Sequence, residues 1–319
     1  MIYLDNAATT LQKPPAVPRA ASYAMCHMAT PGRGGHAPAM LAADTAFACR
    51  QAAAELFQVE GPEQVVFTFN ATHALNIAIK SLVKPGDTVL ISGYEHNAVT
   101  RPLHALGADI RVASGPLFEP GELMESFRSQ LKGVSCVICN HVSNVFGYIL
   151  PVERMAALCR AGGIPLILDA SQSAGCLPVS LAELGAAFIA MPGHKGLYGP
   201  QGTGLLLCAA TPDLWAAFGN RSPVLTGLLI AVLCVFALGA GVLAGLFSVN
   251  ADKAVETAAS RIHGVGSVLG FLALAFAPLL VALLAFRDGA GGAGVFSLIR
   301  QLSETVILPI AGLILTFVA

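Results

Sequence analysis

The chain has little charge for its length. Only 12% of its 319 residues are charged and 55% are hydrophobic, whereas ordinary soluble domains carry about 25% charged residues. The formal net charge is −1, so there is no excess of basic side chains to neutralise a phosphate backbone. We therefore expect no nucleic-acid partner.

A disulfide framework and a signal peptide are also missing. The eight cysteines are scattered, mostly within apolar runs, which suggests buried, reduced thiols in the cytoplasm. Cys136 and Cys139 form a C-x-x-C motif on a predicted strand, where they would face opposite ways. We therefore expect neither zinc nor persulfide chemistry there, and we predict no metal site. The first residues show no basic region followed by a long apolar run.

The scarcity of charge is concentrated in the last third of the chain. The whole sequence has 18 basic and 19 acidic side chains, but few of these lie beyond residue 221. The first two-thirds has the composition of a globular domain, and the last third that of a membrane protein. The charged residues of the last third are Asp252, Lys253, Glu256, Arg261, Arg287, Asp288, Arg300 and Glu304.

Residues 1–208 alternate short β-branched runs with helix-like stretches. This alternation predicts an α/β domain with a seven-stranded, mainly parallel sheet and helices on both faces. The expected strands are 65–69, 88–92, 109–113, 134–139, 165–168, 186–190 and 204–208. The expected helices are 36–57, 72–83, 97–106, 119–132 and 152–161.

After a linker at 209–221, the chain becomes strongly apolar. Residues 222–251 contain no charged side chain, and about 20 apolar residues suffice to span a bilayer. We predict an all-α transmembrane segment of two to three helices at about 224–249, 264–286 and 304–319. We therefore expect a multi-pass membrane protein. Residues 222–319 would contact lipid, and the N-terminal domain would lie in the cytoplasm.

Polar residues follow five of the predicted strands. Because ligands gather at the carboxyl ends of parallel strands, these residues should meet at one edge. The first group, 70–73, also opens a helix, whose free amides can hold a phosphate. The groups are 70–73, 95–97, 141–144, Asp169 and 194–195.

Asp169 and Lys195 are the two residues with the most specific chemistry. A lysine amine can bond to the aldehyde of pyridoxal 5'-phosphate (PLP), and a carboxylate can keep the pyridine nitrogen of PLP protonated. Lys195 lies in a glycine-rich loop, and Asp169 ends an apolar run. The pair predicts PLP as the cofactor, although an acid at a strand end can also be a plain helix N-cap.

Six motifs in the first 208 residues resemble the class V aminotransferase family, and specifically its cysteine desulfurase and selenocysteine lyase branch. The resemblance implies a fold-type I PLP enzyme that acts on a small amino acid, with cysteine converted to alanine and sulfur, and that forms a homodimer. The motifs are Tyr3-Leu-Asp-Asn-Ala-Ala-Thr-Thr10, Gly32-Arg-Gly-Gly-His36, Glu95-His-Asn-Ala-Val-Thr-Arg-Pro102, Ser143-Asn-Val-Phe-Gly147, Asp169-Ala-Ser-Gln172 and Gly193-His-Lys-Gly196.

The resemblance also assigns roles. Lys195 matches the lysine that holds PLP, Asp169 the partner of the pyridine nitrogen, and His96 a histidine stacked on the ring that can move protons. A plain surface histidine is the alternative for His96, and ordinary turn chemistry or a mobile loop is the alternative for the other residues. The resemblance implies phosphate ligands at Thr72 and His194, partners of the ring hydroxyl at Asn144 and Gln172, and substrate contacts at Arg33 and His36. The helix amides of the group 70–73 add Ala71, Thr72 and His73 to the expected cofactor-binding residues.

The sequence departs from this family in two ways. Pro192 replaces a hydroxyl residue that many relatives have before Gly-His-Lys, which removes one phosphate donor. The small domain of the family is missing after residue 208, together with its substrate-binding arginine and, in desulfurases, its nucleophilic cysteine. We therefore expect weak PLP binding and poor turnover.

Residues 222–319 weakly resemble an uncharacterised family of multi-pass bacterial membrane proteins, through 245–250 and 261–264. The chain thus reads as a chimera of a PLP domain and a membrane-protein fragment. Two alternatives remain open: a membrane protein with a non-catalytic binding module of PLP-enzyme fold, and an artefact of gene fusion or assembly.

Overall fold

The computed structural model describes residues 2–32, 34–209 and 223–236, and isolated positions at 238, 262, 265, 266 and 280. The chain divides into two compact units. The first comprises Met1–Ala21 and Arg50–Thr211, and the second comprises Ser22–Cys49 and Pro212–Ala319. The first unit contains the whole sheet.

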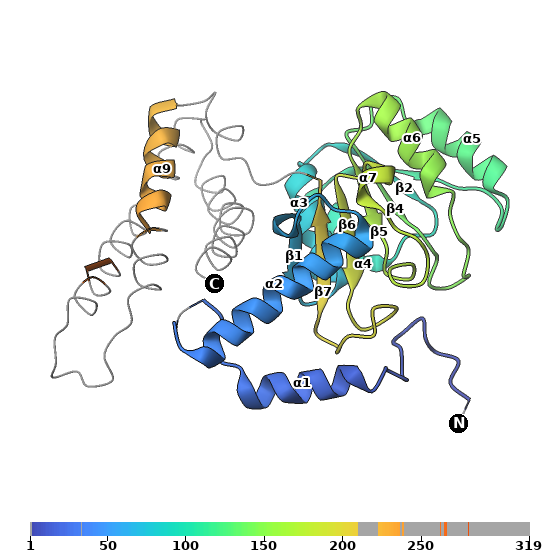
Figure 1. Ribbon diagram of the computed structural model, residues 1–319. Helices are drawn as coiled ribbons and strands as arrows, with labels where there is room; N and C mark the ends of the chain where they lie inside the picture. The colour runs from blue at the N-terminus through green and yellow to red at the C-terminus, as the bar shows by residue number, and fades with distance from the viewer. Residues whose placement is uncertain are drawn as a thin grey trace. The chain divides into compact units, whose positions relative to one another are not determined.

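A seven-stranded sheet in the order β1-β7-β6-β5-β4-β2-β3 forms the centre of the first unit (Figure 1). The predicted number of strands is confirmed, and each strand lies within two residues of its predicted start. The strands are β1 (Val65–Thr68), β2 (Thr88–Ser92), β3 (Asp109–Ala113), β4 (Cys136–Asn140), β5 (Leu166–Asp169), β6 (Phe188–Pro192) and β7 (Gly204–Cys208).

The sheet is mainly parallel, as predicted. The pairs β2–β3, β2–β4, β4–β5 and β5–β6 are parallel, whereas β7 is antiparallel to both of its neighbours, β6 and β1. Since β1 and β6 both oppose β7, they run in the same direction. Six strands therefore end at one edge of the sheet, and β7 begins there.

Helices cover both faces of the sheet, because successive strand residues alternate between two cores. Val89 and Ile91 of β2 join the core that contains α3 and α4, and Leu90 joins the core that contains α5, α6 and α7. The C-terminal end of α2 belongs to the second core as well. The helices of this layer structure are α2 (Ala37–Phe57), α3 (Ala71–Leu82), α4 (Asn97–Leu106), α5 (Pro120–Gln130), α6 (Val152–Gly162) and α7 (Leu181–Leu184).

The two cysteines of the C-x-x-C motif face opposite sides of the sheet, which confirms the prediction. Cys136 lies in the core with α3 and α4, and Cys139 lies in the core with α5 and α6. Burial raises the pKa of the Cys136 thiol to about 12 and raises that of Cys139 as well. Both thiols therefore stay protonated and unreactive at neutral pH.

The sequence pattern does not predict α1 (Ala16–His27) or the single turn of α7. Pro14, Pro15 and Pro18 surround the start of α1 and read as a loop, although proline is tolerated in the first turn of a helix. None of the α1 residues is buried. Ser180 is the N-cap of α7, and its Oγ accepts a hydrogen bond from the Glu183 amide.

The apolar C-terminal part is described only through α9 (Pro223–Phe236), which has 14 residues. Within the described residues, no helix combines the length and the apolar character that crossing a bilayer requires. The predicted span 304–319 lies outside the described residues. So do the end of the span 224–249 and, apart from isolated positions, the span 264–286.

Candidate active site

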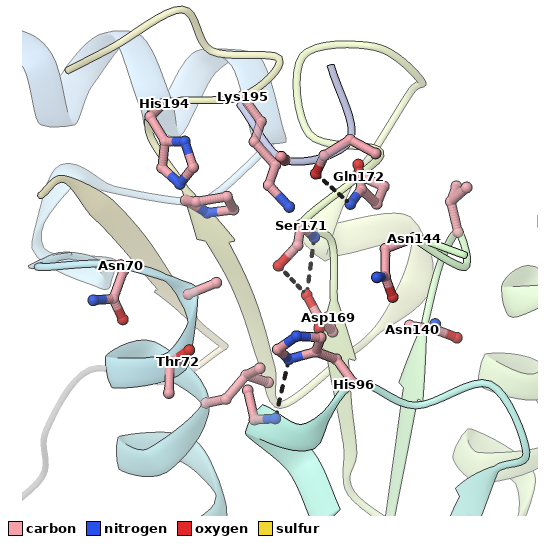
Figure 2. A pocket seen from close by; sticks show the side chains of 17 residues that line it. Asn70, Thr72, His96, Asn140, Asn144, Asp169, Ser171, Gln172, His194 and Lys195 are labelled. Atoms are coloured by element: carbon pink, nitrogen blue, oxygen red, sulfur yellow. Dashed lines mark hydrogen bonds between the residues drawn. The ribbon is translucent and has the colours of Figure 1, made fainter. Parts of the chain in front are cut away.

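A cavity of about 320 Å³ lies at the edge where the parallel strands end (Figure 2). Five of its walls are the segments that directly follow β1, β2, β4, β5 and β6, as the sequence predicts. Eight predicted residues line the cavity together: Ala71, Thr72, His96, Asn144, Asp169, Gln172, His194 and Lys195.

Asp169 is the acid at the base of this cavity. It is the last residue of β5 and is 5% exposed, and its Oδ1 accepts hydrogen bonds from the amide of Ser171 at 2.9 Å and from the Ser171 hydroxyl. Burial raises the pKa of Asp169, and the two bonds from Ser171 oppose that shift, as do His96 and Lys195 more weakly. A buried carboxylate with so few donors favours a positively charged or N–H partner in the cavity.

Lys195 extends from the loop after β6 into the cavity, on the side of Ser171 and Asp169 (Figure 2). Burial lowers the pKa of the Lys195 amine, and the nearby Asp169 carboxylate partly opposes this. A lowered pKa increases the fraction of uncharged amine, which is the nucleophilic form. The neighbouring His194 also has a lowered pKa, caused by burial first and by the charges of Lys195 and Lys13 second.

His96 is the N-cap of α4, and its ring lines the cavity next to Asp169. Its Nδ1 accepts a hydrogen bond from the amide of Ala98 at 3.1 Å. An Nδ1 that accepts is unprotonated, so the neutral ring carries its proton on Nε2. The cap thus sets both the place of the imidazole and its tautomer.

The start of α3 forms the opposite wall. The side chain of Asn70 accepts a hydrogen bond from the amide of His73 at 2.8 Å, which leaves the first amides, those of Ala71 and Thr72, without a partner in the helix. β7 passes close by at Gly204, where a Cβ would lie 2.9 Å from the Asn70 Cα. Only glycine allows this approach, so β7 helps to shape the wall.

His73 is the predicted cofactor residue that does not line the cavity. Its ring stacks on Phe69 with 5.2 Å between centroids, and its Nδ1 accepts from the Phe69 amide at 3.3 Å. His36, one of the two predicted substrate residues, is not among the residues that line the cavity. Arg33 lies outside the described residues, and His36 precedes α2 in the second unit, so their roles stay predictions.

The loops that carry Asp169 and Lys195 touch each other through glycine. A Cβ on Gly175 would lie 2.5 Å from the carbonyl oxygen of Gly196, and a Cβ on Gly196 would lie 2.3 Å from that of Ala174. Gly175 also has a φ of +79°, which favours glycine on its own account. The contact fixes the acid loop and the amine loop relative to each other.

The N-terminal segment closes one side of the cavity, which the sequence does not predict. Ala7 and Ala8 line the cavity, and Nε2 of Gln172 donates to the Ala7 carbonyl at 3.0 Å. The hydroxyl of Thr10 donates to the Lys195 carbonyl at 2.9 Å. The N-terminal segment around residues 7–10 is therefore hydrogen-bonded to Gln172 and to the loop that carries Lys195, in both cases through a backbone carbonyl.

Asn140 is a further lining residue without a sequence-based prediction. It ends β4 and pairs with Asp169 of β5 in the sheet register. The sequence feature that could have identified Asn140 is its position at a strand end, one residue before the predicted group 141–144. His141 itself is buried, 4% exposed, and is not among the residues that line the cavity.

Comparison with known proteins yields two family matches. Residues 2–216 match the family described as aminotransferase class-V. Residues 290–319, which lie outside the described residues, match a family described as TrbL/VirB6 plasmid conjugal transfer like protein. This short match gives weak support to the predicted resemblance of the C-terminal part to membrane proteins.

Similar individual proteins carry the name cysteine desulfurase. A probable cysteine desulfurase of Methanothermobacter thermautotrophicus is 32% identical over 233 residues, which cover 71% of this chain and 56% of the relative. Cysteine desulfurase IscS of Shewanella denitrificans is 35% identical over 230 residues, covering 67% and 54%. The chain thus spans about half the length of these relatives.

A solved structure agrees with this similarity. The apo structure of a cysteine desulfurase from Thermococcus onnurineus NA1 matches with a TM-score of 0.61 and 26% identity, over 88% of this chain and 68% of that one.

Proposed function

Because this chain belongs to the class V aminotransferase family, whose members depend on PLP, we propose that its first unit binds PLP and acts on an amino acid in the manner of a cysteine desulfurase. One observation carries the proposal. Lys195, Asp169 and His96, which come from three different strand ends, line a single cavity.

The residues present fit the pyridine ring of PLP. Burial raises the pKa of the Asp169 carboxyl group, and a ring N–H would supply a further donor that favours its charged form. The Lys195 amine lies in the same cavity with a lowered pKa. The His96 ring supplies a flat surface against which a planar group can stack.

The residues also fit the phosphate of PLP. The unpaired amides of Ala71 and Thr72 stand at the positive end of α3, where phosphates bind readily. The side chains of Thr72 and His194 line the same cavity and add hydrogen-bond donors. Pro192 also lines the cavity, and proline offers no hydrogen-bond donor.

When bound, PLP supplies an electrophilic aldehyde and a ring that stabilises negative charge on the substrate. The protein supplies the other parts of the chemistry. Lys195 is the residue whose uncharged amine would hold the aldehyde. Asp169 would lie against the pyridine nitrogen and favour its protonated form, in which the ring accepts electrons.

The family resemblance implies a proton-transfer role for His96 beside the ring. While the Ala98 amide occupies Nδ1, the neutral ring has its proton on Nε2, so Nε2 can donate that proton but cannot accept another. Asn144 lies in a turn that Ser143 stabilises by accepting from the amides of Val145 and Phe146. From there its side chain can donate to the ring hydroxyl, as the family resemblance implies.

Cysteine is the substrate that the relatives' names favour, with alanine and sulfur as products. The test is to add PLP and then L-cysteine to the full chain and to measure alanine and sulfide. We expect cysteine to change the absorbance of bound PLP, with turnover at least tenfold below that of a full-length relative, because no substrate-binding arginine or sulfur-accepting cysteine is recognisable in the sequence. L-Alanine, which lacks the sulfur, is the control. Bound PLP whose absorbance cysteine leaves unchanged would refute the substrate assignment.

The C-terminal part supports a second proposal, that residues 222–319 insert into a bilayer while the PLP domain stays in the cytoplasm as a homodimer. The low charge of this part and the match at 290–319 support it. Fractionation of cells tests it: we expect the full chain in the membrane fraction and a chain ending at residue 221 in the soluble fraction. Recovery of both in the soluble fraction would contradict the proposal.

A further inference from the structure

The carboxyl group of Glu95 is buried beside the cavity without lining it. Glu95 directly precedes His96, and its Oε1 accepts hydrogen bonds from the Ser92 hydroxyl at 2.5 Å and from the Asn140 amide at 2.8 Å. Its other oxygen, Oε2, is buried and has no hydrogen-bond partner. Although the residue as a whole is only partly covered, its carboxyl group belongs to the interior.

The hydrogen bonds of Glu95 take the place of backbone hydrogen bonds between β2 and β4. The pairing of β2 with β4 stops at Ile91 and Ile138. Beyond that point the Asn140 amide donates to Glu95 Oε1, where a strand carbonyl would otherwise accept. A second bond runs from Asn140 Nδ2 to the Tyr94 carbonyl at 2.6 Å. A third bond runs from the Ser92 hydroxyl to Asn140 Oδ1 at 3.4 Å, so the turn 92–95 and the end of β4 are joined at three points.

We propose that Glu95 is a positioning residue, which ties the end of β4 to the turn before α4 and thereby holds Asn140 and His96 at the cavity. Both of these residues line the cavity. Glu95 is not among the residues that line the cavity, so it acts through its two neighbours. The inference concerns the same site as the proposed function, but the geometry behind it does not depend on which substrate is used.

The surroundings of Glu95 make it a neutral acid at neutral pH. Its partners are a hydroxyl and an amide, and the charged group that acts on it is Asp169 of β5, which has the same sign. Cys139 of β4 is the titratable thiol nearby, and His96 follows in the chain. Burial raises the pKa of Glu95 to about 8, and Asp169 adds to the shift. A neutral Glu95 therefore places no second negative charge beside Asp169.

The test compares Glu95→Gln, which mimics the neutral acid, with Glu95→Ala, which removes both bonds. The protein is the full chain without PLP, and the measurement is urea unfolding followed by backbone circular dichroism. The folded pKa of about 8 lies above the ordinary 4.5, so the folded state keeps a proton that the unfolded state loses. Stability from this group is therefore present at low pH and is lost as the pH rises toward 8.

The quantity to compare is the unfolding equilibrium constant of the natural protein divided by that of Glu95→Gln at the same pH. Between roughly pH 5 and 8 we expect this ratio to rise about tenfold per pH unit. Glu122→Gln, on the exposed face of α5, should follow the natural protein. Identical pH profiles for the natural protein and Glu95→Gln would overturn the neutral-acid assignment. This outcome can be read even if Glu95→Ala fails to fold.

PLP binding then tests the positioning role. We expect Glu95→Gln to bind PLP within about threefold of the natural protein at pH 7, because the amide oxygen still accepts from Asn140. Glu95→Ala should bind at least tenfold more weakly at a temperature where it is folded. Equal affinity in a folded Glu95→Ala protein would refute the positioning role. A natural protein that binds no PLP would instead refute the proposed function and leave the unfolding result intact.

Discussion

Lys195→Ala is expected to abolish the covalent attachment of PLP. No other lysine is among the residues that line the cavity in the described part of the chain, so no second amine can replace it there. The substitution removes only the side chain beyond Cβ, and the loop is held through backbone atoms: the Thr10 hydroxyl donates to the Lys195 carbonyl, and Tyr198 donates to it through its amide. The fold should therefore persist.

The measurement is the visible absorbance that stays with the protein after excess PLP is removed by dialysis. We expect the natural chain to keep a band and Lys195→Ala to lose it completely. Lys80→Ala, on the exposed side of α3, is the matched control and should keep the band. A band of undiminished strength in Lys195→Ala would show that PLP is attached elsewhere and would remove the basis of the proposed function.

Asp169→Asn is expected to have the second-largest effect, through the pyridine nitrogen of PLP. The substitution keeps the shape of the side chain and an oxygen for the Ser171 donors, but it removes the negative charge. A hydrogen bond to a charged group contributes about 1.5–3 kcal/mol, so PLP should bind roughly 10- to 150-fold more weakly. Turnover should fall further, because an unprotonated ring accepts electrons poorly.

A fluorescence or absorbance titration with PLP measures this change in affinity. Asp109→Asn is a suitable control, since Asp109 is exposed at the first residue of β3, on the opposite edge of the sheet, where it accepts from the Thr88 hydroxyl. This variant should bind PLP like the natural chain. An unchanged affinity in Asp169→Asn would show that no positively charged ring nitrogen meets Asp169.

Most of the sheet could be predicted from the sequence because each buried strand is a short run of β-branched and apolar residues between turns. β2 and β3 occur at their predicted limits, and α4 does as well. The same pattern predicts that the site lies where the parallel strands end. Once the strands are parallel, the residues after them must lie on one side, which brought Asp169 and Lys195 to one cavity.

The side-chain environment could not be predicted in the same way. His73 and Thr72 are neighbours in the sequence, but a helix turns successive side chains by about 100°, so Thr72 reaches the cavity and His73 stacks on Phe69. Ala7 is held at the cavity by bonds to residues far along the chain: Gln172 donates to the Ala7 carbonyl, and Thr10 donates to the carbonyl of Lys195. Such contacts join segments whose spacing carries no local signal.

The sequence by itself determined that an acid and an amine stand at the ends of neighbouring strands in a parallel sheet. It also determined that the chain changes composition after about residue 208. Only the tertiary structure decided the electrostatic state of the site. The raised pKa of Glu95 and the lowered pKa of Lys195 both arise first from burial, and burial is produced by segments that meet only when the sheet is assembled.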